Sequence, residues 1–360
     1  MIRTLVALAS LWIAAPLAAQ EADYAAFADF LDTYRKQNNT PSMSAVILRD
    51  GAIVWEGYFG TWDDERDFPT NADTTYYIAS VTKPIAATAI LAESLAGDLD
   101  LGAPMSSDGD WAEFCTYFRG TAIPFMGGGT DMSGHPIPLV DCAKPTTLVE
   151  MLDMRANADS FVYNPIAFAR IDRVISGSGG RDLRAIVRDR ILEPAAMRNV
   201  ALGWRDPEQG DALRLMTMPY HVEDGAIRKQ ALSDDDFRAS AGMIANPRAL
   251  AAFDIAYDRG QLVPPAIRKR LIEGVELGPL GDYRLGWFLE DHEGKRLMWH
   301  SGKDDQRYSA LYLKVPEDRL TLIVLANTEA IWKDGASLVE AKISQNPIGA
   351  QFLEDFVEAE

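Results

Sequence analysis

Strand-forming runs lie near both ends of this 360-residue chain, and helical patterns separate them. Near the N-terminus, the apolar runs 44–49 and 52–59 flank Asp50-Gly51, and this dipeptide favours a two-residue β-hairpin because both turn positions need a positive φ. Toward the C-terminus, four runs have the composition of strands: 285–290, 297–300, 309–315 and 320–325. The simplest assembly is one antiparallel sheet to which both ends of the chain contribute strands.

The middle of the chain has the spacing of helices instead. Thr147 and Glu150 form a capping box that predicts a helix start, and Leu148, Met151 and Leu152 follow at helical spacing. Helical patterns also occur in three other segments, which are 22–35, 168–175 and 183–191.

Because strands and helices are segregated along the chain, the sequence predicts an α+β fold rather than an alternating α/β fold. We expect an antiparallel sheet flanked by helices, with a mainly helical subdomain inserted between the two groups of strands. The sheet subdomain would comprise residues 22–101 and 236–345, and the helical subdomain residues 102–235.

Residues 1–19 have the pattern of a secretory signal peptide. Arg3 supplies a positive start, an apolar run covers 5–17, and Ala18-Ala19 offers small residues for cleavage. The run is short for a membrane span, which takes about 20 apolar residues, and no later segment approaches that length. A buried helix or a membrane anchor is the alternative. The pattern predicts a secreted or periplasmic protein without a membrane span.

Cys115 and Cys142 are the two cysteines of the chain. In an exported protein this even number favours a disulfide, and two buried free thiols are the alternative. The sequence contains no CxxC or HxxxH spacing, so we expect no metal site. Its four histidines are scattered: His135, His221, His292 and His300.

The charge of the chain excludes one large class of partners. Asp and Glu number 53 against 35 Lys and Arg, which gives a net charge of −18. Such a surface repels phosphate backbones, so nucleic acid is not expected as a partner. Charge alone names no substrate.

Ser80 and Lys83 are the first candidates for chemistry. They lie three residues apart at the start of a helical pattern that covers 85–95, so both side chains project from one helix face. A serine hydroxyl is a weak nucleophile until a base takes its proton, and Lys83 can be that base if burial keeps it partly neutral. Taken alone, the pair also fits a capping serine and a surface lysine.

The context of this pair resembles a known superfamily. The segment 76–84 (YYIASVTKP) closely resembles the nucleophile motif of the serine β-lactamases and penicillin-binding proteins, most of all their class C β-lactamase and family VIII esterase branch. The resemblance covers roughly residues 25–345 and lies in an ordered set of motifs. The further matching segments are 97–101, 161–163, 192–197, 240–243, 283–287 and 300–302.

The resemblance implies a role for each matched residue. Ser80 would be the nucleophile and Lys83 its base or proton relay. Tyr163 would exchange protons with the nucleophile and the leaving group, which needs a lowered pKa that a nearby Lys83 could supply. His300 would orient the substrate or assist electrostatically from a strand edge. The active site would lie in the cleft between the sheet and the helical region.

The resemblance also implies an oxyanion hole. Its donors would be the backbone N–H groups of Ser80 and of Lys303, the residue that follows Gly302 in the third motif. The family usually has glycine at the position of Lys303. A cation there could attract a carboxylate-bearing substrate or simply face water.

The second motif departs from the family. Pro165 stands where the family has an asparagine two residues after the tyrosine, and proline cannot supply that side-chain amide. Asn164 is adjacent but would point elsewhere if Pro165 starts a helix. Residues 154–157 (MRAN) replace the His-Thr-Ser-Gly stretch that precedes this motif in the family.

These observations favour an exported serine hydrolase that works through an acyl-enzyme on a small-molecule or peptide substrate, without a metal or other cofactor. An esterase or a peptide hydrolase fits better than a β-lactamase because the altered motifs count against efficient β-lactam turnover. The alternatives are a non-catalytic binding protein that has lost turnover, and a structural exported domain with chance motif matches. The sequence makes no prediction of oligomeric state.

Overall fold

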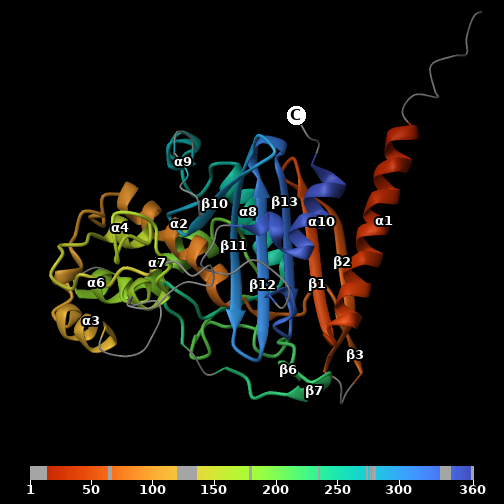
Figure 1. The fold of residues 1–360 in the computed structure, drawn as a ribbon, viewed down its shortest axis with the longest axis horizontal. Coiled ribbons are helices and arrows are strands. Elements are labelled where there is room, and N and C mark those ends of the chain that lie inside the picture. The colour runs from red at the N-terminus through yellow and green to blue at the C-terminus, as the bar shows by residue number, and fades with distance from the viewer. Residues whose placement is uncertain are drawn as a thin grey trace, which may run out of the picture.

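The computed structural model describes residues 14–63, 67–119, 136–177, 181–233, 236–272, 275, 277, 281–332 and 342–357. Among these residues, eight strands form one antiparallel sheet in the order β3-β2-β1-β13-β12-β11-β10-β9 (Figure 1). Strands from both ends of the chain meet in its middle, where β1 pairs with β13. The predicted α+β fold is therefore confirmed.

The N-terminal strands form the predicted hairpin. They are β1 (Ser42–Arg49), β2 (Ala52–Asp63) and the short β3 (Phe68–Pro69). Between β1 and β2, Asp50 and Gly51 have φ values of 55° and 71°, as the Asp-Gly turn requires. Because β1 has β2 on one side and β13 on the other, it is a central strand and almost all of its residues are buried.

The C-terminal part supplies five strands, with one difference from the sequence prediction. The predicted strand 285–290 starts too early, because Leu285 and Gly286 form a turn with φ values of 42° and 85°. The strands are β9 (Asp282–Arg284), β10 (Trp287–His292), β11 (Lys295–Asp304), β12 (Tyr308–Val315) and β13 (Leu320–Ala326).

Two small sheets were not predicted. One has the order β4-β8-β5, and the other pairs β6 with β7. Their strands are too short to show the alternation that identifies a strand in sequence. Their bounds are β4 (Tyr76–Tyr77), β5 (Ala201–Leu202), β6 (Tyr220–Glu223), β7 (Ala226–Lys229) and β8 (Met243–Ala245).

Helices cover both faces of the large sheet. On one face, α1 (Ala14–Gln37) and α10 (Pro347–Phe356) pack together, with the Phe27 ring 5.5 Å from that of Phe356 (Figure 1). On the other face, α8 (Pro247–Asp258) packs against β1 and β13, and Asp254 accepts a hydrogen bond from Tyr312 Oη of β12. One face of the sheet is thus covered by helices from the two ends of the chain, and the other face by α8.

A helical region lies beside the sheet, on the left in Figure 1. The predicted capping box starts α4, because Thr147 Oγ1 accepts a hydrogen bond from the Glu150 N–H while the Glu150 carboxylate accepts one from the Thr147 N–H. The disulfide between Cys115 and Cys142 is present and links α3 to the segment before α4. The helices are α3 (Trp111–Arg119), α4 (Leu148–Leu152), α5 (Pro165–Phe168), α6 (Ile171–Gly177), α7 (Leu183–Val187) and a π-helical turn η4 (Arg188–Leu192).

The expected signal peptide lies largely outside the described residues, which begin at residue 14. From Ala14 the backbone is one continuous helix, α1, that also contains the predicted amphipathic segment 22–35. None of the helices described here is long and apolar enough to cross a membrane.

Candidate active site

Ser80 lies in a 3-10 turn, η1 (Ala79–Val81), that leads from β4 into α2 (Thr82–Leu95). Pairing of β4 with β8 and a 3.0 Å hydrogen bond from the Ile78 N–H to the Met243 carbonyl fix the approach to this turn. Ala79 has φ 46°, a left-handed conformation that alanine rarely adopts. Such a position costs on the order of 1–3 kcal/mol and is held by its surroundings, which here present Ser80 at the helix start.

Lys83 is completely buried and its amine lies next to the Ser80 hydroxyl. Its Nζ is 2.8 Å from Ser80 Oγ and 2.8 Å from the carbonyl oxygen of Ser240. It also lies 5.2 Å from the centroid of the Tyr163 ring. Burial lowers the pKa of Lys83 well below its ordinary value, because the charged form loses its hydration. This environment favours the neutral amine, which can accept a proton.

Tyr163 neighbours the same lysine and serine. Its ring is buried and stacks on Phe288 at 5.4 Å between centroids. Burial raises the pKa of Tyr163, and the Ser80 side chain acts in the opposite direction. The lowered pKa that the sequence predicted, with Lys83 as its cause, is therefore wrong, because loss of hydration in the buried site outweighs the effects of neighbouring groups. The structure therefore brings together three of the predicted site residues, Ser80, Lys83 and Tyr163, within one water-poor cluster.

His300 lies on β11 at the back of this cluster and is fully buried. Its Nδ1 is 2.7 Å from the Ser301 carbonyl oxygen, and its Nε2 is 2.9 Å from Tyr283 Oη. Burial, followed by the nearby charge of Lys83, lowers the pKa of His300 well below its ordinary value. Both ring nitrogens are thus engaged within the protein, and the electrostatic role suits this histidine better than direct contact with a substrate.

Gly302 lies where β11 passes the nucleophile turn. A Cβ added at this position would lie 2.1 Å from the Ile78 carbonyl oxygen, so only glycine permits this approach. β10 pairs with β11 only up to Trp299, so the stretch from His300 to Asp304 is paired on the β12 side alone. β11 also contacts η1, the turn that carries Ser80.

Lys303 follows Gly302, and its side chain is engaged by acids. Its Nζ lies 3.0 Å from Glu329 Oε1 and 3.3 Å from Asp305 Oδ1. We expected Lys303 either to attract a substrate carboxylate or to face water. The structure shows neither arrangement, because two carboxylates of the protein itself pair with the lysine. The lysine is half-buried and neutralised by two carboxylates, which leaves its backbone N–H as the group of interest for an oxyanion.

The altered second motif has a clear structural result. Pro165 starts α5, and the Asn164 side chain caps that helix by accepting a hydrogen bond from the Ala167 N–H at 2.9 Å. The Asn164 amide also donates to Asn157 Oδ1 at 2.9 Å. Asn164 therefore points away from Lys83, as expected. Lys83 donates instead to the Ser240 carbonyl oxygen at 2.8 Å.

The sequence did not predict the contacts that three further residues make at the site. Ser240 and Tyr283 lie in segments that matched the family, but nothing in a sequence shows that a carbonyl or a phenol reaches Lys83 or His300. Trp332, which donates a 3.1 Å hydrogen bond from its Nε1 to the Gly302 carbonyl, lies in no matched segment. These contacts arise from chain folding rather than from local spacing.

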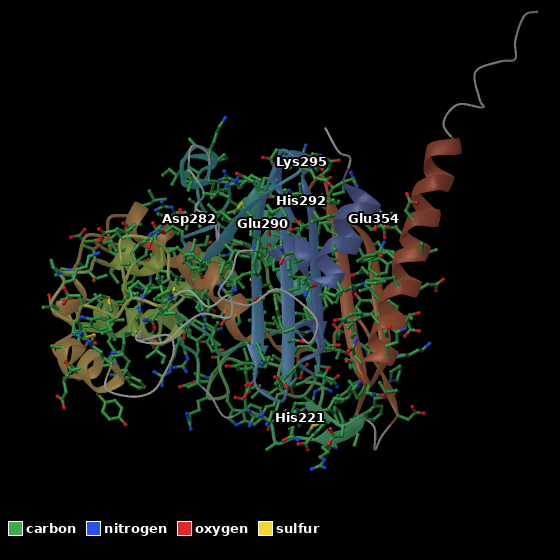
Figure 2. All side chains as sticks on the ribbon, in the orientation of Figure 1. His221, Asp282, Glu290, His292, Lys295 and Glu354 are labelled. Atoms are coloured by element: carbon green, nitrogen blue, oxygen red, sulfur yellow. A yellow bond between two sulfur atoms is a disulfide. The ribbon has the colours of Figure 1, made fainter. Side chains whose placement is uncertain are left out.

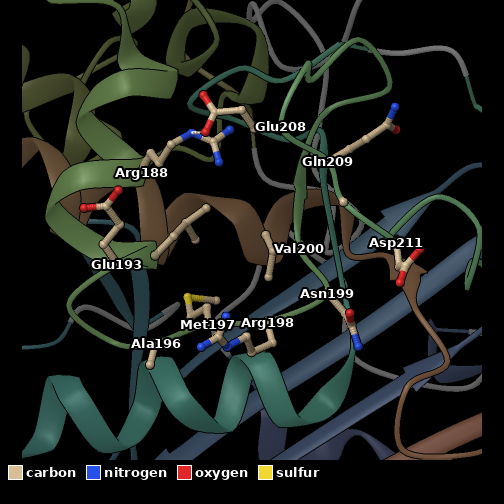
Figure 3. Close-up of a pocket in the computed structure, with 12 residues that line it drawn as sticks. Arg188, Glu193, Ala196, Met197, Arg198, Asn199, Val200, Glu208, Gln209 and Asp211 are labelled. Atoms are coloured by element: carbon tan, nitrogen blue, oxygen red, sulfur yellow. Dashed lines mark ion pairs between the residues drawn. The ribbon is translucent and has the colours of Figure 1, made fainter.

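Away from Ser80, the structure describes two further histidines and a pocket beside η4. Figure 2 shows His221 and His292 near opposite ends of the large sheet, far from each other. Among the residues described above, no group of three or more His, Cys, Asp or Glu side chains is placed to hold a metal ion. A pocket of about 470 Å³ beside η4 (Figure 3) contains Arg188, whose guanidinium is already paired with Asp206 and Glu208.

Comparison with known proteins identifies the family. A family model described as Beta-lactamase matches residues 27–342, which is most of the chain. The chain belongs to the Beta-lactamase family. The superfamily inferred from the ordered motifs is therefore confirmed, and the match includes the strands and helices that surround Ser80.

Individual relatives of this Beta-lactamase family member include an esterase. The protein described as Esterase EstB from Burkholderia gladioli is 40% identical over 202 residues, which cover 49% of this chain and 49% of that protein. The chain thus spans about half the length of this relative.

Solved structures share the fold at low identity. An octameric penicillin-binding protein homologue from Pyrococcus abyssi aligns with a TM-score of 0.67 and 18% identity, covering 92% of this chain and 77% of that one. A class C β-lactamase from Rhodobacter sphaeroides aligns with a TM-score of 0.61 and 14% identity, covering 85% and 94% of the two chains. These likenesses support the Beta-lactamase fold.

Proposed function

We propose that this protein is a serine hydrolase that cleaves an ester or amide through an acyl-enzyme, with Ser80 as the nucleophile. One observation carries the proposal: the buried Lys83 amine lies 2.8 Å from Ser80 Oγ. A lysine that hydrogen-bonds to a backbone carbonyl and a hydroxyl, and whose pKa is lowered by burial, is suited to accept a serine proton.

Acylation follows from this contact. Ser80 Oγ attacks the substrate carbonyl carbon while its proton passes to Lys83 Nζ, directly or through the Tyr163 hydroxyl. The carbonyl oxygen becomes an oxyanion, and the backbone N–H groups of Ser80 and Lys303 would donate hydrogen bonds to it. Collapse of this intermediate expels the alcohol or amine, which takes up the proton, and leaves an ester on Ser80.

Deacylation repeats the proton movements with water. A water molecule attacks the acyl carbon and gives its proton to the Tyr163–Lys83 pair. Ser80 Oγ leaves and regains a proton from the same pair, and the acid product departs. Tyr163 is the suitable relay because its ring lies 5.2 Å from Lys83 Nζ and its pKa responds to Ser80, whereas the Tyr283 hydroxyl is engaged by His300.

The altered motifs and the similarity to an esterase both favour an ester as the substrate. The absence of a side-chain amide at Pro165 removes a group that would bind a substrate amide carbonyl. Lys303 is held by Glu329 and Asp305, so the site offers no free cation at that position for a substrate carboxylate. An uncharged ester therefore fits better than a β-lactam carrying a carboxylate, and a peptide remains the second choice.

We also propose that the protein is exported, as residues 1–19 indicate, to the periplasm or the exterior of the cell. The Cys115–Cys142 disulfide supports an oxidising compartment. The proposed sheet subdomain (22–101 and 236–345) and helical subdomain (102–235) would meet at Ser80, because α2 contacts both α7 and β11.

An active-serine probe tests the proposal. A fluorophosphonate should label the protein covalently at Ser80, and S80A should abolish the labelling while keeping the melting temperature. Turnover of p-nitrophenyl butyrate and of a chromogenic cephalosporin then separates an esterase from a β-lactamase. Absence of labelling at every pH from about 6 to 9 would overturn the enzyme assignment.

A second candidate is a binding protein that has kept the pocket and lost turnover. The observation in its favour is Pro165, which removes the motif amide beside Lys83. The same probe distinguishes the two, because a binding protein would retain ligands reversibly without a covalent bond to Ser80.

A further inference from the structure

Two buried tyrosines lie beside His300, and their hydroxyls have different partners. The centroid of the His300 ring is 6.1 Å from that of Tyr163 and 5.7 Å from that of Tyr283. Tyr163 interacts with Ser80, whereas Tyr283 Oη contacts His300 Nε2 at 2.9 Å. Tyr283 belongs to the motif-like segment 283–287, for which the proposed mechanism has no role.

The hydrogen bonds of His300 define its tautomer. The Ser301 carbonyl oxygen can only accept, so the Nδ1 atom 2.7 Å away must carry a hydrogen. A neutral ring then has a lone pair on Nε2, and the Tyr283 hydroxyl donates its hydrogen there. Burial and the nearby Lys83 charge disfavour a protonated imidazole at this place.

We propose that Tyr283 is a positioning residue for the reaction: its hydroxyl holds His300 in the neutral Nδ1–H form, and this pair supports the Tyr163 ring against Ser80. The inference rests on the proposed serine hydrolase function. The Tyr163 ring is enclosed by His300, by Tyr283 at 6.2 Å and by Phe288 at 5.4 Å between centroids. A rotated or charged His300 would disturb that enclosure, and a charged ring would place a cation near the Lys83 amine.

Contacts on several sides hold Tyr283 in place, so it can keep His300 and the Tyr163 ring in position. Its backbone N–H donates a 2.7 Å hydrogen bond to Asp282 Oδ1, and the carboxylate of Asp282 is paired with Arg155 and Arg284. The Asp282 label in Figure 2 lies where β9 borders the helical region. The ring of Tyr283 also stacks on Phe161 at 5.7 Å between centroids. Tyr283 therefore links the sheet edge, the helical region and the third motif.

The first test reads the tautomer directly and requires no activity. In protein labelled with 15N at histidine, long-range 1H–15N spectra should show His300 neutral with hydrogen on Nδ1 between about pH 5 and 9. Four histidines contribute signals, and those of His300 are identified because they disappear in H300Q. A protonated His300, or hydrogen on Nε2, would overturn the inference.

The second test compares two tyrosine-to-phenylalanine variants. In Y283F, the Nε2 signal should shift and fluorophosphonate labelling of Ser80 should slow about tenfold, because a buried acceptor loses its donor. With p-nitrophenyl butyrate, kcat should fall while KM stays within about twofold, since Tyr283 is fully buried and its hydroxyl contacts His300. Y312F is the matched control: it removes the hydroxyl that donates to Asp254 and should leave both readouts unchanged.

The outcomes separate the two proposals. If the wild type is labelled and Y283F is labelled equally fast, the role of Tyr283 is wrong and the serine hydrolase assignment stands. If the wild type is not labelled, the hydrolase assignment fails, and the NMR result alone decides the state of His300. Melting temperatures of both variants show whether a slower reaction reflects a loss of folded protein.

Discussion

Gly302 lies so close to Ile78 that a single methyl group at Gly302 would lie 2.1 Å from the Ile78 carbonyl oxygen. The contact joins the late strand β11 to the turn that presents Ser80, and it leaves no room for any side chain. A Cβ contact under 3 Å requires the backbone on one side to move, so the distance between the two elements is fixed by the absence of a side chain at residue 302.

G302A should therefore displace η1 or β11. We expect fluorophosphonate labelling of Ser80 to slow by about tenfold or more, because a small misplacement of the oxyanion donors is costly. The melting temperature should also fall. G109A provides the control, since a Cβ at Gly109 meets nothing within 4 Å. Labelling of G302A at the wild-type rate would contradict the close contact described here.

Lys83 should determine how the reaction depends on pH. Burial places the pKa of Lys83 well below its ordinary value, so the neutral amine becomes available at a lower pH than for a free lysine. Labelling should rise with pH through this lowered pKa and then level off. K83R should remove the labelling across the same range, because arginine stays protonated.

The same burial has a consequence for stability. The unfolded chain binds a proton at Lys83 more readily than the folded chain, so the free energy of unfolding should increase as the pH rises between the folded and unfolded pKa values. K83M should lose this dependence. Urea unfolding of both proteins at a series of pH values measures the difference, and parallel curves would be evidence against a buried, largely neutral lysine.

Asp172 should produce a stability change at acidic pH. Burial raises the pKa of Asp172 to about 6, although its carboxylate accepts a 2.9 Å hydrogen bond from the Ala239 N–H. The folded state thus binds the proton more tightly, and stability should fall as the pH rises from about 4 to 6, by up to about 3 kcal/mol. D172N keeps an acceptor oxygen and should abolish this loss in urea titrations.

Reduction of the Cys115–Cys142 disulfide should lower stability without abolishing the reaction. The two cysteines are 27 residues apart, and a loop of this size contributes roughly 3–4 kcal/mol in the chain-entropy model. Both cysteines lie away from the Ser80 turn, on α3 and before α4. The C115S/C142S double variant should unfold at lower urea concentration and still be labelled at Ser80; loss of labelling in folded protein would contradict this separation.

The sequence predicted the elements whose pattern is local. Asp50-Gly51 has the positive φ values that define the hairpin, and Thr147 with Glu150 forms the expected cap. Short strands such as β4 could not be predicted, because two residues cannot show an alternating pattern. The composition of 285–290 predicts a strand, but Leu285 and Gly286 have positive φ values and form a turn.

The candidate site divides in the same way. Ser80 and Lys83 could be paired from their helical spacing, and their 2.8 Å contact agrees with it. The Ser240 carbonyl and the Tyr283 hydroxyl could not be foreseen, because each reaches the site from a distant segment and acts through an atom whose position depends on folding. The order of the motifs indicates which segments come together at the site, whereas the three-dimensional structure is needed to show which atoms are in contact.

The pairing of Met43 with Ala326 in the middle of the sheet has a consequence for biosynthesis. A growing chain presents β1 early and β13 late, so the central pair forms only after nearly all of the chain is available. Ser80 is synthesised early, but the turn that contains it packs against Gly302 of the late strand β11. A product of interrupted synthesis that ends before β11 would therefore contain Ser80 without the strand that packs against its turn, and we expect such a product to remain unlabelled by a fluorophosphonate.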